Sequence, residues 1–347
     1  MKSRIDGIGI KAISVAVPQK TVNVKDYVKC RSSKNIERVI KHTGIDKIRI
    51  AENNITTSDL CLNAAQSFFK GNYNKEDICA IVFISKTPDF FVVPTTSCIL
   101  QKRMEFSQDI LCYDSLAACY GYVAGLQLAG MLSKLHNKDV LLMTGDTNSR
   151  IISEFDLSSV MFGDGGSASI IGLQKNNSMS FNIKNDGNIS SMTSVAVGGF
   201  RVPVTPESFE YKKDDQGNVR QDWQMKMNGL EVANFVVGEV ANLIKDTMNE
   251  YGGANFFDVY ALHQPNEIII KSLVSCLNIE KEKVPIKVNG YGNISSASIP
   301  LTLCSHYGNK DKPDKINALL AGFGSGASWG TVVTNLSETD FYPVQEI

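Results

Sequence analysis

The sequence lacks the features that mark several large classes of protein. Its 347 residues carry 35 Lys and Arg against 36 Asp and Glu, so no excess of positive charge favours nucleic acid or an anionic membrane as a partner. No apolar run has the length of a transmembrane helix, and residues 1–9 contain no continuous apolar stretch of a signal peptide. The eight cysteines are scattered singly, without a C-x-x-C pair. We therefore expect a cytoplasmic protein with free thiols.

The sequence pattern also lacks sites for metals and common cofactors. No group of His, Cys, Asp and Glu has metal-ligand spacing. The glycines at 322, 324 and 326 precede no Gly-Lys-Ser/Thr and open no βαβ unit, which excludes a phosphate-binding loop and argues against a dinucleotide site. We therefore expect no metal and no cofactor. What is present, 43% hydrophobic and 20% charged residues, is typical of a globular protein with a sizeable core.

Short apolar runs alternate with longer stretches of helical spacing. The runs predict strands at residues 80–85, 110–113, 140–143, 167–172, 259–262, 284–288, 317–321 and 330–333. The longer stretches predict helices at 58–69 with Ser58 as N-cap, and at 119–132, 228–250 and 266–277. This alternation favours an α/β fold with a buried sheet, and the polar residues 206–220 predict an exposed loop.

One order of elements occurs twice. Residues 110–128 read as a strand, a turn of small residues and an apolar helix, and residues 285–304 repeat that order. A strand–loop–helix block precedes each copy, and a strand with a Gly-rich segment follows it. The repeat predicts two pseudo-symmetric halves, residues 1–175 and residues 176–347.

Cys119 is the strongest candidate for a catalytic residue. It lies in Asp114-Ser-Leu-Ala-Ala-Cys119-Tyr-Gly, after an apolar strand and at the start of an apolar helix. A helix N-terminus favours the thiolate, which is the nucleophilic form, and the small neighbours leave room for a substrate. Most cysteines are instead buried structural residues. We assign that structural role to Cys79, Cys98, Cys112 and Cys304.

Two uncharged donors and a glycine-rich loop complete the candidate site. His263 follows the strand at 259–262, where its Nε2 can donate to a developing oxyanion. Asn293 occupies in the second half the place of Cys119 in the first, and its side chain suits stabilisation of an enolate oxygen. An ordinary loop histidine and an asparagine helix cap are the alternative interpretations. The loop at 322–330 lets the backbone approach a ligand, and an N–H there could pair with that of Cys119 as an oxyanion hole.

Six motifs together resemble those of the β-ketoacyl-[acyl-carrier-protein] synthase III family of thiolase-like condensing enzymes, and they cover nearly the whole chain. They are Thr43-Gly-Ile, Asp114-Ser-Leu-Ala-Ala-Cys119, Phe162-Gly-Asp-Gly, His263-Gln-Pro-Asn266, Gly292-Asn293-Ile-Ser-Ser-Ala-Ser, and Gly322-Phe-Gly-Ser-Gly with Trp329-Gly. The resemblance implies a five-layer αβαβα thiolase-like fold of two halves, the first with the nucleophilic Cys and the second with the His and Asn. It also implies a homodimer that acts on acyl thioesters of coenzyme A or acyl carrier protein.

The resemblance implies a role for each site residue. Cys119 takes an acyl group from a thioester, and malonyl-acyl carrier protein then binds and loses CO₂. His263 and Asn293 stabilise the resulting enolate, which attacks the acyl-Cys119 carbonyl. The backbone N–H groups of Cys119 and Ser325 form the oxyanion hole, although a glycine is usual at Ser325. Substrate-binding positions fall at Val93, Asn266, Gly324 and Gly326.

Several positions depart from the family pattern. Arg38 and His42 stand where a Trp and an Arg help to hold coenzyme A, and Ile268 stands where an Arg contacts the carrier protein. A bulky aromatic residue limits the acyl pocket in members that use acetyl groups, and its place falls near Val93. We therefore expect a primer that is not restricted to acetyl-CoA.

Three other functions remain open from the sequence. The first is a specialised acyltransferase or a non-decarboxylating condensing enzyme of secondary-metabolite or glycan modification. The second is a papain-like cysteine hydrolase, in which Cys, His and Asn occur in the same order, but its Cys-Gly-Ser-Cys-Trp signature is missing. The third is a catalytically silent partner subunit, against which Cys119, His263 and Asn293 argue.

Overall fold

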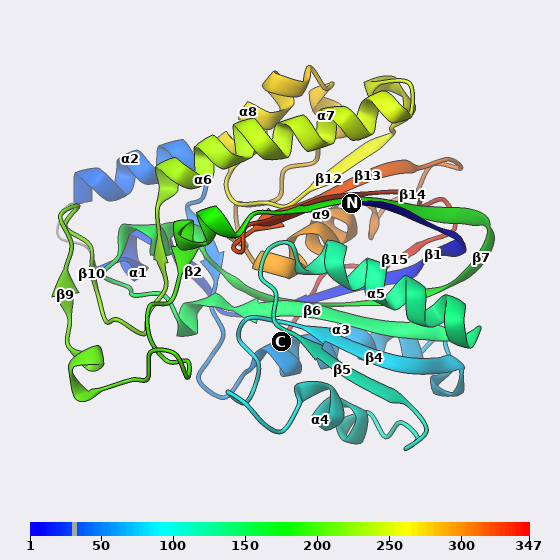
Figure 1. Ribbon diagram of the computed structural model, residues 1–347, viewed down its shortest axis with the longest axis horizontal. Coiled ribbons are helices and arrows are strands. Elements are labelled where there is room, and N and C mark those ends of the chain that lie inside the picture. Colours follow the sequence, from blue (N-terminus) through cyan, green and yellow to red (C-terminus); the bar gives the residue numbers. More distant parts are fainter. Residues whose placement is uncertain (30–32) are drawn as a thin grey trace.

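The computed structural model describes residues 1–29 and 33–347 and is built around one sheet. The sheet has 10 strands, and its main path runs β12-β13-β14-β7-β6-β4-β5. In that order the strands are Val259–Leu262, Asn317–Gly324, Ser328–Asn335, Asp164–Asn185, Asp139–Thr147, Ile78–Ile84 and Leu111–Ser115. The antiparallel β1 (Lys2–Val17) lies along β7, and β15 (Asp340–Phe341) and β16 (Gln345–Glu346) pair with β1. The long β7 thus joins β12, β13 and β14 on one side to β6, β4 and β5 on the other (Figure 1).

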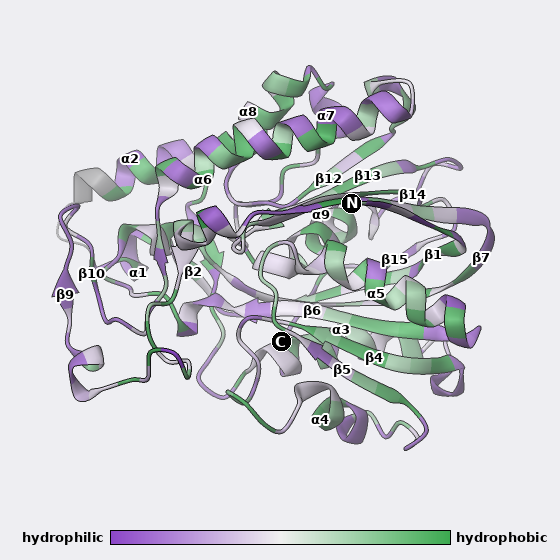
Figure 2. Ribbon diagram, in the orientation of Figure 1, coloured by the Kyte–Doolittle hydropathy of each residue, from purple (hydrophilic) through white to green (hydrophobic). Residues whose placement is uncertain are grey.

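Buried side chains alternate across the strands and form three apolar clusters. In β4, Val82 belongs to the central cluster and Phe83 to an outer one, whereas in β12 Ala261 is central and Leu262 belongs to the other outer cluster. Because successive side chains of a strand point to opposite faces, both faces of the sheet are buried. Figure 2 shows the matching apolar colour along the central strands and α5.

Helices fill the three clusters. The outer helices α3 (Thr57–Phe69) and α4 (Thr96–Arg103) cover one face, and α7 (Ala241–Glu250) and α8 (Glu267–Leu277) cover the other. Between them lie α5 (Gly121–His136) and α9 (Ser298–Tyr307), which share the central cluster (Figure 1). The expected α/β class and its αβαβα layers are therefore confirmed.

Shorter elements surround this frame. They are β2 (Thr21–Asn23), α1 (Val24–Tyr27), α2 (Ser33–Thr43), β3 (Lys47–Arg49), β8 (Thr193–Ser194), β9 (Lys212–Lys213), β10 (Val219–Arg220), β11 (Lys226–Met227) and α6 (Gly229–Phe235). The predicted loop at 206–220 is a mostly exposed segment that contains the β9–β10 hairpin. Among the described residues, no helix is long and apolar enough to cross a membrane.

The strand β7 crosses the proposed boundary between the halves. Its first part, from Asp164, pairs with β6, and its last part, which ends at Asn185, pairs with β14. The residues between these parts, 173–176, are largely exposed. Because one strand spans both halves, the boundary between residues 175 and 176 remains a proposal.

Most predicted elements are confirmed, and two predictions need correction. The predicted helix at 228–250 is one continuous helix of α6, a π-helical segment (Val236–Val240) and α7, capped by Asn228. The N-cap of α3 is Thr56 instead of Ser58, since the Thr56 N–H donates to the Asp59 carboxylate at 2.7 Å. No element was predicted for residues 1–17, which contain the strand β1.

The second correction concerns residues 284–288, which form no strand. Pro285 has no N–H to donate, and its carbonyl accepts from Gln264 Nε2 at 3.3 Å. The Lys287 N–H donates to Gln264 Oε1 at 2.9 Å. One buried glutamine side chain therefore takes the place of a neighbouring strand, and the second copy of the repeat lacks its strand.

Candidate active site

Cys119 lies at the junction that the sequence predicted, between β5 and α5. It is two residues before Gly121, the first residue of α5. Gly324 at the end of β13 comes so close that an added Cβ would lie 2.9 Å from the Cys119 Cβ. Only glycine fits there without a shift, so the glycine-rich loop is held against the thiol.

His263 follows β12 and is almost fully buried, with 2% of its surface exposed. Its N–H donates to the Ala321 carbonyl at 2.8 Å, and its ring packs edge-to-face on Phe323 at 5.1 Å between centroids. Nδ1 lies 2.6 Å from Ser298 Oγ. Burial, with a smaller contribution from the charge of Lys86, lowers the pKa of His263 to about 3. The imidazole is therefore neutral across the physiological pH range.

Asn293 is fixed by the loop that carries the Phe162-Gly-Asp-Gly motif. Its N–H donates to the Met161 carbonyl at 2.7 Å, and its carbonyl accepts from the Gly163 N–H at 3.2 Å. A Cβ at Gly163 would lie 1.9 Å from the Tyr291 carbonyl oxygen, so glycine permits this contact. The Ser295 N–H donates to Asn293 Oδ1 at 2.8 Å. With Oδ1 engaged, the Nδ2 amide remains as the donor toward the cavity.

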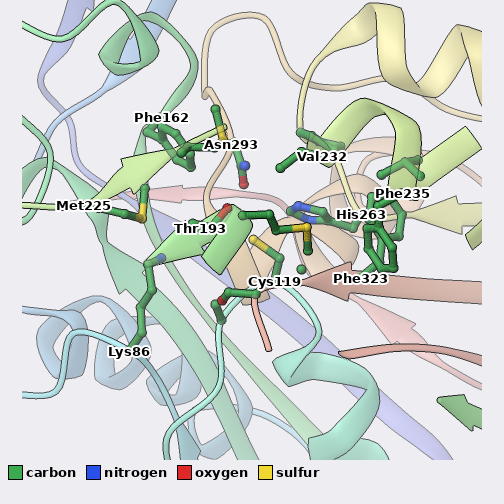
Figure 3. Close-up of a pocket in the computed structure, with 17 residues that line it drawn as sticks. Lys86, Cys119, Phe162, Thr193, Met225, Val232, Phe235, His263, Asn293 and Phe323 are labelled. Carbon is green, nitrogen blue, oxygen red and sulfur yellow. The ribbon is translucent and has the colours of Figure 1, made fainter. Parts of the chain in front are cut away.

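The three side chains meet in one cavity. Figure 3 shows Cys119, His263 and Asn293 directed toward a shared space, with Phe323 beyond His263. The space between the lining atoms is about 560 Å³, including the open mouth, which suits a small-molecule site. Most of the remaining lining is apolar. It comprises Ala118, Phe162, Met192, Met225, Met227, Val232, Phe235, Val236, Pro265 and Phe323.

The other predicted site residues divide into two groups. Gly324 and Ser325 line the cavity beside Cys119. Gly326, Asn266 and Val93 do not line it: Asn266 caps α8 through a 3.0 Å hydrogen bond from the Ile269 N–H, and the Val93 side chain is 74% exposed on the surface of its own chain.

Sequence reasoning missed Lys86, Ser295 and the three methionines of the cavity. Lys86 lines the cavity and lies two residues after the end of β4. Functional residues of α/β folds gather at the C-terminal ends of strands, so this position was a signal in the sequence. Ser295 Oγ lies 3.5 Å from Cys119 Sγ. Met192, Met225 and Met227 come from a stretch without regular periodicity, so no local pattern indicated them.

Opposing effects act on the Cys119 thiol. Burial raises its pKa, whereas the charge of Lys86 and the hydrogen bond with Ser295 lower it, and the net direction is upward. The helix N-terminus is thus not the only influence on the thiolate, contrary to the simplest expectation from the sequence.

The arrangement contains a thiol, two neutral donors and apolar walls. These groups are suited to acyl transfer through a thioester and to stabilisation of an oxyanion. The seven cysteines within residues 1–29 and 33–347 are unpaired, and Cys30 lies outside those ranges. In the same ranges, no group of three or more His, Cys, Asp and Glu side chains could hold a metal ion.

Comparisons with known proteins identify the family of this chain. Residues 113–187 match the family model of 3-oxoacyl-[acyl-carrier-protein] synthase III, and residues 254–336 match the model of its C-terminal part. The β-ketoacyl-[acyl-carrier-protein] synthase III of Campylobacter jejuni subsp. jejuni serotype O:6 is 30% identical over 339 residues, which cover 96% of this chain and 98% of the relative. That of Natranaerobius thermophilus is 30% identical over 332 residues, which cover 93% and 97%.

Solved structures give the same result. A 3-oxoacyl-(acyl-carrier protein) synthase from Burkholderia xenovorans superposes with a TM-score of 0.92 at 27% identity, covering 100% of this chain and 99% of that one. A 3-oxoacyl-(acyl-carrier-protein) synthase III superposes with a TM-score of 0.87 at 29% identity, covering 94% and 99%. The fold is therefore the thiolase fold, and the chain belongs to the β-ketoacyl-[acyl-carrier-protein] synthase III family of acyltransferase-type condensing enzymes.

Proposed function

We propose that this protein joins an apolar acyl group to a malonyl thioester on acyl carrier protein, with loss of CO₂, through an acyl-Cys119 intermediate. The observation that carries the proposal is the convergence of Cys119, His263 and Asn293 in one apolar cavity. A single nucleophile with two neutral donors matches a reaction that first forms a thioester and then an enolate. The names of the relatives support the carrier protein as the partner.

In the first step, the Cys119 thiolate attacks the carbonyl carbon of the donor thioester. A new carbon–sulfur bond forms, the original one breaks, and the donor leaves as a thiolate that takes up one proton. The backbone N–H groups of Cys119 and Ser325 are the proposed oxyanion hole, and Ser325 lines the cavity next to Gly324. This role depends on the main chain, so a serine can replace the usual glycine.

In the second step, the carbon–carbon bond to the malonyl carboxylate breaks, and its electron pair forms an enolate. His263 and Asn293 donate to the enolate oxygen, and the enolate carbon then attacks the acyl-Cys119 carbonyl and releases the Cys119 thiolate. The Asn293 donor is Nδ2. The His263 donor is Nε2–H. In that tautomer Nδ1 accepts the Ser298 hydroxyl proton, so this proton turns from the Ser295 carbonyl, 2.8 Å from Ser298 Oγ, to Nδ1, 2.6 Å from it.

The experiment that tests the function combines acyl loading with product analysis. The protein is incubated with a series of acyl-CoA and acyl-carrier-protein thioesters, from acetyl to long straight-chain and branched groups, and its intact mass is measured. Malonyl-acyl carrier protein is then added. We expect a stoichiometric acyl adduct with donors longer than acetyl, followed by a 3-oxoacyl product and one CO₂ for each carbon–carbon bond.

Each competing function has its own result in that experiment. A parallel sample contains peptide substrates, and hydrolysis of these peptides with no carbon–carbon bond formed from the thioesters would favour a cysteine hydrolase. A carbon–carbon bond without CO₂ would favour a non-decarboxylating condensation, and an adduct passed to a hydroxyl or an amine would favour a specialised acyltransferase. An unchanged mass with every donor would favour a silent partner subunit.

The apolar cavity predicts which donors load. Met225 is 5% exposed and lines the cavity, so Met225→Trp fills part of its volume. We expect loading of long acyl groups to fall at least about tenfold relative to short ones, the usual effect of a few methylenes in an apolar pocket. Intact-mass kinetics with paired donors measures this ratio. Met131→Trp is the matched control, because Met131 is half exposed on α5. An equal loss for all donors would place Met225 outside the acyl site.

The edge of the sheet supports the proposed homodimer. Within the described ranges β5 is the last strand on its side, where it pairs with β4. Tyr113 on this strand is 44% exposed, and the loop before α4 exposes Phe91 at 74%. An exposed apolar edge strand pairs readily with another chain, and a second copy can pair with it about a two-fold axis.

We expect Tyr113→Glu to convert the dimer to monomers at micromolar concentration, since a buried charge at a central contact costs at least about 2 kcal/mol. Light scattering coupled to gel filtration measures the mass. Leu135→Glu at the end of α5 is the control, because Leu135 is 73% exposed but distant from β5 in sequence and layer. A dimer that survives Tyr113→Glu but not Leu135→Glu would place the interface elsewhere.

A further inference from the structure

Lys86 is a cation beside the candidate nucleophile that the proposed reaction does not yet use. Its side chain is 16% exposed and lines the cavity that also holds Cys119 and His263 (Figure 3). Its Nζ donates to Asn148 Oδ1 at 2.5 Å and to Ser295 Oγ at 3.2 Å, and lies 3.4 Å from Asp146 Oδ2. Asp146 has no exposed surface, so the two charges form a buried ion pair.

These contacts argue against Lys86 as a binding site for a substrate carboxylate. Two of the three N–H donors of this ammonium group are engaged by Asn148 and Ser295, and Asp146 Oδ2 lies 3.4 Å away as an ion-pair partner without a hydrogen bond. A ligand carboxylate would therefore compete with the buried Asp146 for this cation. Breaking a buried ion pair costs several kcal/mol, which such a contact would have to recover.

Ser295 connects Lys86 to Cys119. Its Oγ accepts from Lys86 Nζ and lies 3.5 Å from Cys119 Sγ. A hydroxyl that accepts from an ammonium keeps its own proton free to donate, and the sulfur is the neighbour toward which that proton can point. A hydrogen bond polarised by a charge is stronger than a neutral one, particularly in a protein interior.

The backbone of Ser295 holds this hydroxyl in place. Ser295 is fully buried, with φ of 55°, a left-handed conformation that is uncommon for a residue other than glycine. Its N–H donates to Asn293 Oδ1 at 2.8 Å, and its carbonyl accepts from Ser298 Oγ, which in turn contacts His263. One strained residue therefore contacts Cys119 and Asn293 directly, and His263 through Ser298. Strain of this kind persists where the surrounding contacts impose it.

We propose that Lys86 is a positioning residue that acts through Ser295: its ammonium orients the Ser295 hydroxyl toward Cys119 Sγ and so stabilises the thiolate that attacks the acyl donor. The inference rests on the proposed role of Cys119 as the nucleophile. In this proposal the thiolate is stabilised by two sources: the N-terminus of the helix and a hydrogen bond from Ser295 that the charge of Lys86 polarises. The proton lost from Cys119 goes to solvent, and Ser295 and Lys86 keep theirs.

The charges around Cys119 allow a test, because they shift the pKa of its thiol in opposite directions. Lys86 lowers the pKa of the Cys119 thiol, and Asp146 raises it. His263 lines the same cavity and is neutral, so it adds no charge. Removing the negative charge of Asp146 alone should therefore favour the Cys119 thiolate. Removing the charge of Lys86 as well should then disfavour it.

The experiment compares Asp146→Asn with the double variant Lys86→Met, Asp146→Asn. The asparagine can still accept at Oδ1 from Ser85 Oγ and the Lys86 N–H, and the double variant leaves no unpaired buried charge. The rate of alkylation by iodoacetamide is measured against pH, and Cys119 is followed by mass spectrometry of its peptide. The exposed Cys276 gives an internal reference in each sample.

We expect the midpoint for Cys119 to fall in Asp146→Asn and to rise above the wild-type value in the double variant, each by about one pH unit, or about tenfold in rate at neutral pH. The midpoint of Cys276 should not move. Damage to the fold would shift the Cys119 midpoint in the same direction in both variants. A shift in the same direction, or no shift, would overturn the proposal.

A second comparison tests the route through Ser295. Ser295→Ala removes the hydroxyl, and Ser295→Gly also relieves the left-handed backbone. Both should raise the Cys119 midpoint. With Asp146→Asn present, Lys86→Met should have a clearly smaller effect on the Cys119 midpoint when residue 295 is alanine than when it is serine, because interacting sites are not additive. Independent, additive shifts would show that Lys86 does not act through Ser295. If the double variant does not fold, the opposite shifts of Asp146→Asn and Ser295→Ala still decide.

Alkylation needs no acyl donor, which separates this inference from the proposed function. Midpoints that shift as expected in a protein that never loads an acyl group would support the thiolate network and refute the condensation. An acyl adduct on Cys119 together with unchanged midpoints would refute the thiolate network and support the acyl-Cys119 intermediate.

Discussion

Replacing Cys119 with alanine is expected to abolish the acyl adduct with every donor, a loss of at least about a thousandfold in loading rate, as for removal of an enzymic nucleophile. Cys119 is the cysteine of the cavity, which Gly324 and Ser325 also line. Intact-mass measurement over time gives the loading rate. Cys276→Ala, which changes an exposed cysteine, is the matched control and should load normally.

The same variant separates the two steps of the proposed reaction. Cys119→Ala retains His263 and Asn293, so a malonyl thioester should still lose CO₂ while no carbon–carbon bond forms. Release of ¹⁴C-labelled CO₂ measures this directly. An acyl adduct that persists in Cys119→Ala would show that another residue is the nucleophile, and the roles of the cavity would have to be assigned again.

The candidate site could be predicted because each of its main residues lies next to a recognisable element. Cys119 follows β5 and precedes α5, and His263 follows β12. The ends of strands and the starts of helices are visible in the local pattern of apolar residues. The resemblance then joined residues that are far apart in the chain. The structure brings Cys119, His263 and Asn293 into one cavity. Neither the local apolar pattern nor the family resemblance could demonstrate this.

The network around Lys86 could not be predicted, since its partners come from distant segments. Asp146 is 60 residues away and Ser295 is 209 residues away. A lysine after a strand is ordinarily a solvated surface residue, and only the packing of β6 and the Asn293 loop converts it into a buried cation. The left-handed backbone of Ser295 likewise results from tertiary contacts, because serine has no intrinsic preference for it.

The errors in the fold have a related cause. Residues 284–288 have the composition of a strand, but their hydrogen bonds go to the side chain of Gln264. Residues 1–17 have mixed polarity at their start, yet residues 2–16 pair with the part of β7 between Gly166 and Asn182. Strand formation depends on a partner far away in sequence, which a local pattern does not contain.

Replacing His263 or Asn293 with alanine is expected to slow condensation far more than loading. Each side chain is proposed to donate to the enolate oxygen, and removal of one such donor costs about 10²–10³ in rate. Loading depends on Cys119 and backbone N–H groups, so it should change by less than about tenfold. Intact mass gives the loading rate, and the 3-oxoacyl product gives the condensation rate. His136→Ala and Asn242→Ala, both exposed on helices, are the controls.

The pH dependence distinguishes the neutral donor proposed for His263 from a general base. Burial and the charge of Lys86 lower the pKa of His263 to about 3, so the imidazole loses its proton well below the usual value and stays neutral above it. Condensation measured from preloaded acyl-Cys119 should therefore show no inflection near pH 6.5, where an exposed histidine titrates. An inflection there that disappears in His263→Ala would mean that His263 changes charge during catalysis. Equal losses of loading and condensation in that variant would instead mean that His263 activates the Cys119 thiol, and the enolate would then depend on Asn293 alone.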